Sequence, residues 1–228
     1  MNLQDNEEIK KIMKLRQDKI FKHLMEDDIS IEYPDGYDEK DPLENDFVIN
    51  MGPQHPATHG VLRLLLRLDG ERVRKCVPEI GYLHRGFEKS CENHTYSQVI
   101  PYTDRLNYCS AILNNIGWAK AIEDMMKIEI TPRAKMIRVV IGELSRIIDH
   151  FVCNAANMVD LGGLTSLWYL FGARDQAYDL LSKLTGARLT NTYTRIGGLE
   201  FDLYDGFEKD LEEVLKTSEK AIEDVLSL

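Results

Sequence analysis

The spacing at which apolar residues recur along the chain changes at Pro78, and no other feature of the sequence constrains the fold as strongly. Before Pro78, apolar-rich runs at residues 61–68 and 73–77 flank Asp69-Gly70, a dipeptide typical of short β-hairpin turns. After Pro78, apolar residues recur at helical spacing. We therefore predict a mainly α protein of the α+β class, in which a small N-terminal antiparallel β-sheet leads into a helical bundle.

Five helical patterns follow the predicted hairpin. They cover residues 84–96, 104–128, 132–161, 165–184 and 206–228, and a loop is expected at 195–198. Asp104 is a candidate N-cap, Pro132 suits a first helical position, and glycines such as Gly186 are expected to end helices. The final pattern stops without a capping residue, so we expect the bundle to be incomplete at the C-terminus.

Charge and composition divide the chain into three parts. Residues 1–46 hold 14 Asp and Glu against 7 Lys and Arg, whereas the remainder holds 24 against 21. We predict that 1–46 form an acidic leader, made of a helix and an extended arm that lies on a partner. Residues 47–80 should form the sheet, and residues 81–228 the helical bundle.

Composition also excludes several classes of function. The net charge is −10, which disfavours a nucleic-acid partner because phosphate binding needs a basic surface. No signal peptide is visible, and no run approaches the roughly 18 apolar residues of a membrane span, so we expect a soluble chain that meets a membrane only through partners. The cysteines form no CxxC pair, so we expect reduced cytosolic thiols and no zinc or iron–sulfur site.

The segment from Asn50 to Gly60 holds two histidines, His55 and His59, in a loop rich in Pro and Gly. Their spacing resembles that of a zinc-binding helix, but Pro56 disfavours helix at His55 and no glutamate lies between them. Two alternatives stay open. The loop is a rigid turn whose histidines bond to backbone, or a histidine donates to a ligand carbonyl, since imidazole changes charge near neutral pH.

Three further residues could carry chemistry or could be structural. Tyr108 is either a core-edge tyrosine with a satisfied hydroxyl or a hydrogen-bond donor and proton source. Asp160 lies in an apolar stretch, where a buried carboxylate needs a partner such as histidine, although it could instead bond to nearby backbone. Arg85 stands in a charged helix start that could equally be a solvated face.

Taken together, these segments resemble one family. The motifs NMGPQHPATHG, EIGYLHRGFEK, PYTDRLNY, GELSRIIDHF, DLGGLT and YTRIGG occur in the order found in the 49 kDa, or D-type, subunit of complex I, over about residues 47–215. The resemblance implies a fold like the hydrogenase large subunit. It also implies a quinone-binding peripheral-arm subunit of a respiratory NADH:quinone oxidoreductase, which helps to pass electrons from the terminal iron–sulfur cluster to quinone, coupled to proton translocation.

The resemblance implies a role for each site residue. His59 would bond one carbonyl of a menaquinone or ubiquinone, Tyr108 would lie at the other end of the headgroup, and Asp160 would pair with the histidine. Arg85 would lie near a [4Fe–4S] cluster that a partner holds, so this chain would bind no metal. A redox-linked histidine of the family is replaced here by Thr190.

The family also implies partners and a location. NADH would be oxidised in another subunit. The neighbours would be peripheral-arm subunits, above all the cluster-bearing B-type and the C-type subunits, together with the membrane arm. The chain would lie peripherally on the cytoplasmic face of the plasma membrane.

Two other functions are weighed against this one. The family is related to the large subunit of nickel–iron hydrogenases, but Asn107 and Ser110 stand where hydrogenases carry cysteines, and a nickel site needs such soft thiolates. A truncated chain could also be a non-catalytic scaffold without a complete quinone pocket.

Overall fold

The computed structural model describes residues 46–58 and 60–228. Within these residues the chain divides into two compact units between Arg85 and Gly86. The predicted helix and extended arm of the acidic leader cover residues 1–46, of which 1–45 lie outside the described residues and Asp46 begins the first strand. The three-part division of the chain therefore stays a prediction.

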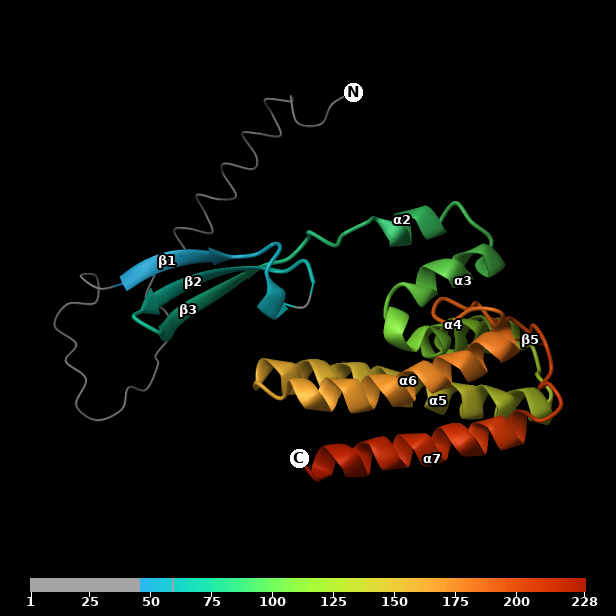
Figure 1. Cartoon of the computed structure of the whole chain (residues 1–228). Coiled ribbons are helices and arrows are strands. Elements are labelled where there is room, and N and C mark those ends of the chain that lie inside the picture. The colour runs from blue at the N-terminus through green and yellow to red at the C-terminus, as the bar shows by residue number, and fades with distance from the viewer. Residues whose placement is uncertain (1–45, 59) are drawn as a thin grey trace. The chain divides into compact units, whose positions relative to one another are not determined.

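The first unit is built on a three-stranded antiparallel sheet of order β1-β2-β3 (Figure 1). Its strands are β1 Asp46–Met51, β2 Arg63–Asp69 and β3 Arg72–Glu79. Asp69 pairs with Arg72, and Gly70 in the turn between them has a φ of 57°, a conformation that glycine adopts readily. The predicted hairpin at Asp69-Gly70 is confirmed.

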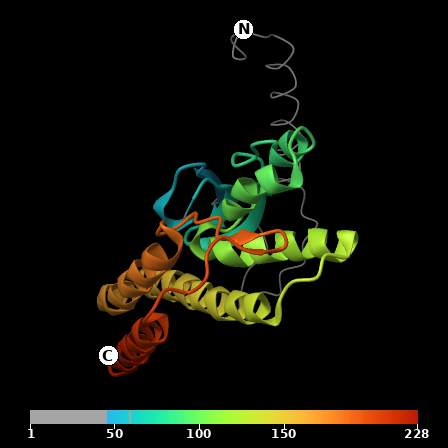
Figure 2. The same cartoon turned by 90° about the vertical axis from the view of Figure 1, so that its right-hand side faces the viewer.

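The second unit is helical. Its elements are α2 Phe87–Cys91, α3 Tyr96–Asp104, the 3₁₀ turn η3 Tyr108–Ser110, α4 Ala111–Met126, α5 Pro132–Asp160, α6 Leu164–Thr185 and α7 Phe207–Leu226. Helices α5, α6 and α7 lie side by side in both views (Figures 1 and 2). A small antiparallel sheet and a mainly helical remainder confirm the predicted fold class.

Local signals place several helix ends correctly. Pro132 opens α5, and the Thr131 side chain caps it by accepting a hydrogen bond from the Ala134 N–H at 3.3 Å. Helix α6 ends at Gly186, whose φ of 80° lies in the left-handed region. Pro132 and Gly186 therefore act as the sequence predicts.

Three predicted elements differ from the structure. Instead of one helix over 84–96, the short α2 is followed by turns up to α3. Asp104 is the last residue of α3 and not an N-cap, because the chain leaves helical geometry before α4, with φ values of −138° at Asn107 and −127° at Ser110. The expected loop at 195–198 is a tight hairpin between β4 Thr194–Arg195 and β5 Gly198–Leu199.

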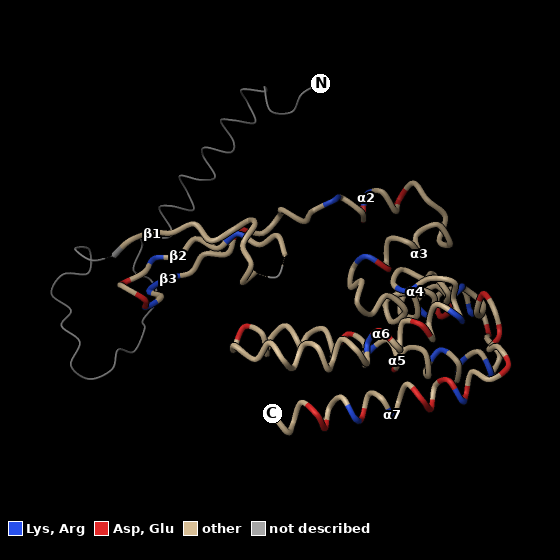
Figure 3. Tube along the Cα trace, viewed as in Figure 1, with Lys and Arg blue, Asp and Glu red and all other residues tan. Residues whose placement is uncertain are grey.

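The main core of the helical unit lies between the long helices. Its fully buried members include Ile112 of α4, Ile141 and Ile148 of α5, and Tyr193 in the segment after α6. Along α7, acidic and basic residues alternate with uncharged ones (Figure 3), while Phe207 and Val214 of this helix are buried in the core. Such an amphipathic helix is held mainly by its apolar face.

A buried ion pair fastens the β4–β5 hairpin to α4 and α5. Arg138 of α5 donates from both terminal nitrogens to Glu123 of α4, at 2.8 and 2.7 Å, and both side chains are about 95% buried. Arg138 also donates to the carbonyls of Arg195 and Gly198, while Glu123 accepts from the Gly197 N–H at 2.8 Å. The hydrogen bond from Arg138 lowers the pKa of Glu123.

Replacing Arg138 with methionine should lower the free energy of unfolding of the chain by ~3–5 kcal/mol, because an unpaired buried carboxylate remains. Since Arg138 holds the folded-state pKa of Glu123 below its ordinary value of 4.5, the pair stabilises the fold above that pH and loses its effect as the pH falls. Urea denaturation at several pH values measures this loss, which should shrink in acid.

The matched control is Arg133→Met on the same helix, where the Arg133–Asp202 pair is about two-thirds exposed on both sides. This variant should change the free energy of unfolding far less than Arg138→Met does, because solvent screens an exposed ion pair. Equal losses in the two variants would contradict a special role for the buried pair.

Candidate functional site

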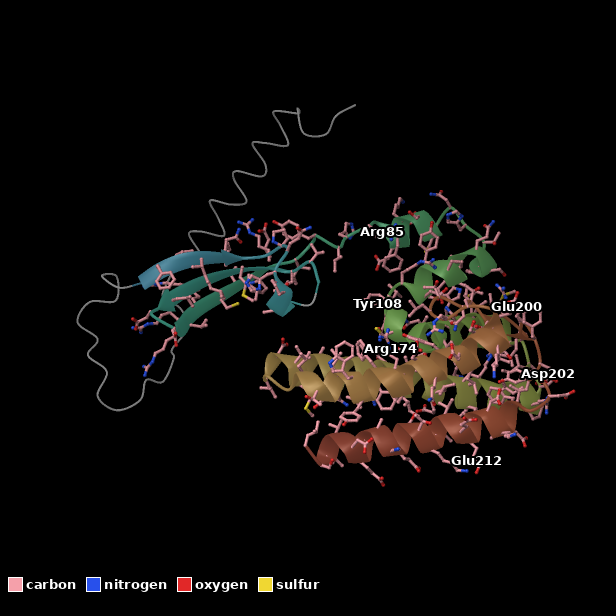
Figure 4. The ribbon with its side chains drawn as sticks, in the orientation of Figure 1. Arg85, Tyr108, Arg174, Glu200, Asp202 and Glu212 are labelled. Carbon is pink, nitrogen blue, oxygen red and sulfur yellow. The ribbon has the colours of Figure 1, made fainter. Side chains whose placement is uncertain are left out.

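Tyr108 lies on the turn that joins α3 to α4. Its side chain is 61% exposed, and its hydroxyl makes no hydrogen bond to another described residue. A core-edge tyrosine with a satisfied hydroxyl would look different, since burial would demand a partner. Figure 4 labels Tyr108 on this turn and Arg174 on α6. The phenol is therefore presented outward by its own helical unit.

The beginning of this turn is anchored by a buried carboxylate. Asp104 is fully buried, and its Oδ1 accepts a hydrogen bond from Asn115 Nδ2 of α4 at 2.7 Å. The same amide donates to Thr103 Oγ1 at 3.0 Å. Burial raises the pKa of Asp104, and the hydrogen bond from Asn115 offsets part of that rise.

The end of the turn is anchored by a second carboxylate, from α5. Asp149 Oδ2 accepts hydrogen bonds from Asn107 Nδ2 at 3.0 Å and from Ser110 Oγ at 3.3 Å. Asn107 Nδ2 also donates to Ser110 Oγ at 2.7 Å, so the three side chains close a triangle. The residues on each side of the Tyr108–Cys109 pair are thus tied to one point on α5.

Charged and aromatic groups of α6 lie near this triangle. Arg174 donates to the Tyr178 hydroxyl at 3.0 and 3.2 Å, and its guanidinium lies 4.8 Å from the centres of the Phe171 and Tyr178 rings. Burial raises the pKa of the Cys109 thiol, the charge of Asp149 raises it further, and Arg174 lowers it. Burial is therefore the main cause of the raised pKa of Cys109, and the charges of Asp149 and Arg174 act on that pKa in opposite directions.

Asp160 differs from the sequence-based expectation. Its side chain is exposed, because it is the last residue of α5 and lies beyond Ala155, the last buried residue of that helix. The following Leu161 is 87% exposed. The Asp160 carboxylate is therefore not the buried group that the apolar stretch predicted.

The remaining predicted residues belong to the first unit. Arg85 is exposed and is the last residue of that unit. His59 lies outside the described residues. His55 accepts a hydrogen bond from the Ala57 N–H on its Nδ1 at 3.2 Å, and its carbonyl accepts one from Thr58 Oγ1 at 2.8 Å. The hydrogen bond on His55 Nδ1 is of the kind that the rigid-turn alternative expects, and it leaves Nε2 outside that bond. Tyr108 and Asp160 both belong to the helical unit.

Sequence reasoning missed the groups that anchor the turn. Asp149, Asn115 and Asp104 are hydrogen-bonded to residues 11 or more positions away, so no local motif links them. The sequence did carry a signal for two of these residues, although it was weaker than a motif. Asp104 and Asn115 are polar residues among apolar helix positions, where a buried polar group needs a partner.

The described part of the chain holds neither a metal-binding cluster nor a membrane-spanning helix. Over residues 46–58 and 60–228, no three His, Cys, Asp or Glu side chains are grouped so that they could bind a metal ion. In the same part of the chain, each helix is too short or too polar to cross a bilayer.

Sequence comparison adds the class of protein. Residues 160–228 match the family described as respiratory-chain NADH dehydrogenase, 49 Kd subunit. Two proteins named as the D subunit of NADH-quinone oxidoreductase are similar over more of the chain: that of Pelobacter propionicus is 49% identical over 176 residues, and that of Desulforamulus reducens 54% over 162 residues. These regions are 77% and 71% of this chain and 44% of each relative.

A protein of Bdellovibrio bacteriovorus, named as the C/D subunit of NADH-quinone oxidoreductase, is 49% identical over 180 residues, which are 79% of this chain and 32% of that protein. The chain belongs to the family of the 49 kDa, or D-type, subunits. It spans less than half the length of these curated relatives.

Replacing Asp104 with asparagine should change how stability depends on pH. Because burial raises the folded-state pKa of Asp104 above its ordinary value of 3.8, wild-type stability from this group is complete below 3.8 and is lost as the pH rises through the folded-state pKa. The variant keeps an acceptor for Asn115 but does not ionise. Its free energy of unfolding should therefore rise relative to wild type as the pH increases, as measured by denaturation.

Asp124→Asn on α4 is the control, because the Asp124–Lys120 pair is about two-thirds exposed. The difference between this variant and wild type should stay nearly constant over the same pH range. A constant difference for Asp104→Asn as well would mean that burial of Asp104 does not perturb its ionisation.

Proposed function

We propose that the chain acts as the quinone-site subunit of a proton-translocating NADH:quinone oxidoreductase of the complex I type. Its membership of the 49 kDa family supports the class of complex, and the names of its relatives specify quinone as their oxidant. The observation that carries the assignment to a site is the exposed phenol of Tyr108 on a turn that is anchored at both ends.

The chemistry of this turn suits a quinone headgroup. Reduction places negative charge on both quinone oxygens, and preplaced donors stabilise such charge. Tyr108 would donate a hydrogen bond from its hydroxyl to one oxygen and supply a proton to it, since a phenol gives up its proton only to a basic acceptor. His59 would donate a hydrogen bond to the other quinone oxygen. The Asp160 carboxylate would orient that histidine and balance its positive charge.

Other subunits would supply the electrons. NADH would be oxidised elsewhere in the complex, and a [4Fe–4S] cluster on a B-type subunit would deliver single electrons close to Arg85. A C-type subunit would be a neighbour, in line with the relative whose name joins C and D. Loss of a proton from the His59–Asp160 pair would change local charge and bias the membrane arm. The chain would lie peripherally on the cytoplasmic membrane face.

The hydrogenase alternative fits the side chains poorly. Asn107 and Ser110, at the positions of the two hydrogenase cysteines, are occupied in hydrogen bonds to each other and to Asp149. Amide and hydroxyl groups do not replace soft thiolate ligands for nickel. The other alternative is a non-catalytic scaffold, and the activity of a Tyr108→Phe variant distinguishes it from the proposed function.

Tyr108→Phe should lower donor-driven, inhibitor-sensitive quinone reduction in native membranes by ~100-fold, because one donor to the developing oxyanion is lost. Co-purification of the cluster-bearing subunit must show that the complex still assembles. Full activity in an assembled complex would leave Tyr108 a structural residue and favour the scaffold function.

Tyr96→Phe is the matched control. Tyr96 is the first residue of α3, its side chain is 50% exposed, and its ring packs near Trp118 and takes no part in the hydrogen bonds of the Asp149 triangle. Removal of its hydroxyl should leave quinone reduction within about twofold of wild type, since its loss removes no donor from the proposed site.

Thr190 motivates a prediction about the potential of the partner's cluster. Thr190 is half-buried between the exposed Leu189 and the buried Asn191, and threonine cannot take up a proton as the family's histidine does. Thr190→His should raise the midpoint potential and give it a pH dependence approaching ~59 mV per pH unit, the slope of a one-electron, one-proton couple. Redox titration by electron paramagnetic resonance measures both. A steep slope already present in wild type would contradict this.

A further inference from the structure

We propose that Asp149 is a positioning residue, which fixes the Tyr108 turn against α5 and so sets where the phenol meets its substrate. The inference rests on the proposed function of Tyr108 and goes beyond it, because Asp149 lies on another helix and acts on the position of Tyr108 and not on the substrate itself. It is carried by the closed triangle of Asp149, Asn107 and Ser110.

Each polar hydrogen of the Asn107 amide and of the Ser110 hydroxyl has an acceptor within this triangle. Asn107 has two amide hydrogens, one for Ser110 Oγ and one for Asp149 Oδ2, and the Ser110 hydroxyl donates its single hydrogen to the same carboxylate oxygen. Ser110 is 97% buried, so its hydroxyl depends on these partners. A charged acceptor makes such hydrogen bonds stronger than neutral ones.

The backbone of the turn relies on the same residues. Among the described residues, the Asn107 carbonyl accepts hydrogen bonds only from the Ser110 N–H, at 3.2 Å, and from the Asn114 side chain, at 3.3 Å. A 3₁₀ segment this short is weak by itself. Asp149 therefore supplies tertiary hydrogen bonds that residues nearby in the sequence do not provide.

Tyr108 has no comparable tie of its own. Its hydroxyl bonds to no other described residue and most of its ring is exposed. Its location is consequently set by the backbone to which it is attached, and that backbone is held by Asp149. A displacement of about 1 Å in a reacting group can reduce a rate ~100-fold. Asp149 acts on the reaction only through Tyr108.

The test uses the assembled complex and two readouts. Amide hydrogen exchange of residues 107–111 reports opening of the turn independently of activity. Quinone reduction, resolved into kcat and KM, reports the placement of Tyr108. Asp149→Ala should speed exchange in the turn at least tenfold and lower kcat ~10- to 100-fold with little change in KM. Glu143→Ala, which removes an exposed carboxylate from the same helix, should alter neither readout.

Rescue separates the proposed contact from general damage. Asn107→Asp alone sets two carboxylates against each other, whereas Asn107→Asp combined with Asp149→Asn exchanges donor and acceptor and restores the pair. The double variant should recover slow exchange and a kcat within about threefold of wild type. Failure of the double variant to improve on either single variant would overturn the proposal.

Combination with Tyr108→Phe distinguishes the two claims. If Asp149 acts through Tyr108, Asp149→Ala should lower kcat no further when the phenol hydroxyl is already absent. A further loss of full size would overturn the positioning role. Full activity of Tyr108→Phe by itself would contradict the proposed function instead, and unchanged amide exchange in Asp149→Ala would overturn the anchoring of the turn whatever the activity.

Discussion

The buried Glu123–Arg138 pair is the interaction on which the helical unit depends. It joins α4 to α5 and, through the carbonyls of Arg195 and Gly198, holds the β4–β5 hairpin against both. Removal of two charges from water is costly, and this arrangement offsets the cost with a paired guanidinium and carboxylate whose other hydrogen bonds go to backbone. With α4 and α5 fixed, Asn115 on one helix and Asp149 on the other are placed to hold the turn that precedes α4.

That turn shows how a short irregular segment acquires a defined position. Asp104 anchors its start through Asn115, and Asp149 anchors its end through Asn107 and Ser110. Between these points Tyr108 is free of internal hydrogen bonds within the described residues and extends outward. The helical unit therefore holds the exposed phenol of Tyr108 on an anchored turn, which is the arrangement that a hydrogen-bond donor to a bound headgroup requires.

The sequence predicts those parts of the structure that carry local signals. The hairpin at Gly70, the start of α5 at Pro132 and the end of α6 at Gly186 were predictable because turn and capping residues act within a few positions. The family was predictable because several motifs occur in a fixed order. The break between α3 and α4 was not, because it is stabilised by contacts between residues 11 to 42 positions apart. The exposure of Asp160 also escaped prediction, since an apolar stretch does not reveal where a buried helix face ends.

In the proposed function, the anchored turn presents Tyr108 to a quinone headgroup. The most direct test of this function is a cryo-electron microscopy structure of the complete complex with a bound quinone. We expect the Tyr108 hydroxyl to lie within ~3 Å of one headgroup oxygen, with Asp149 still hydrogen-bonded to Asn107 and Ser110. A headgroup bound in the same complex out of reach of Tyr108 would contradict it.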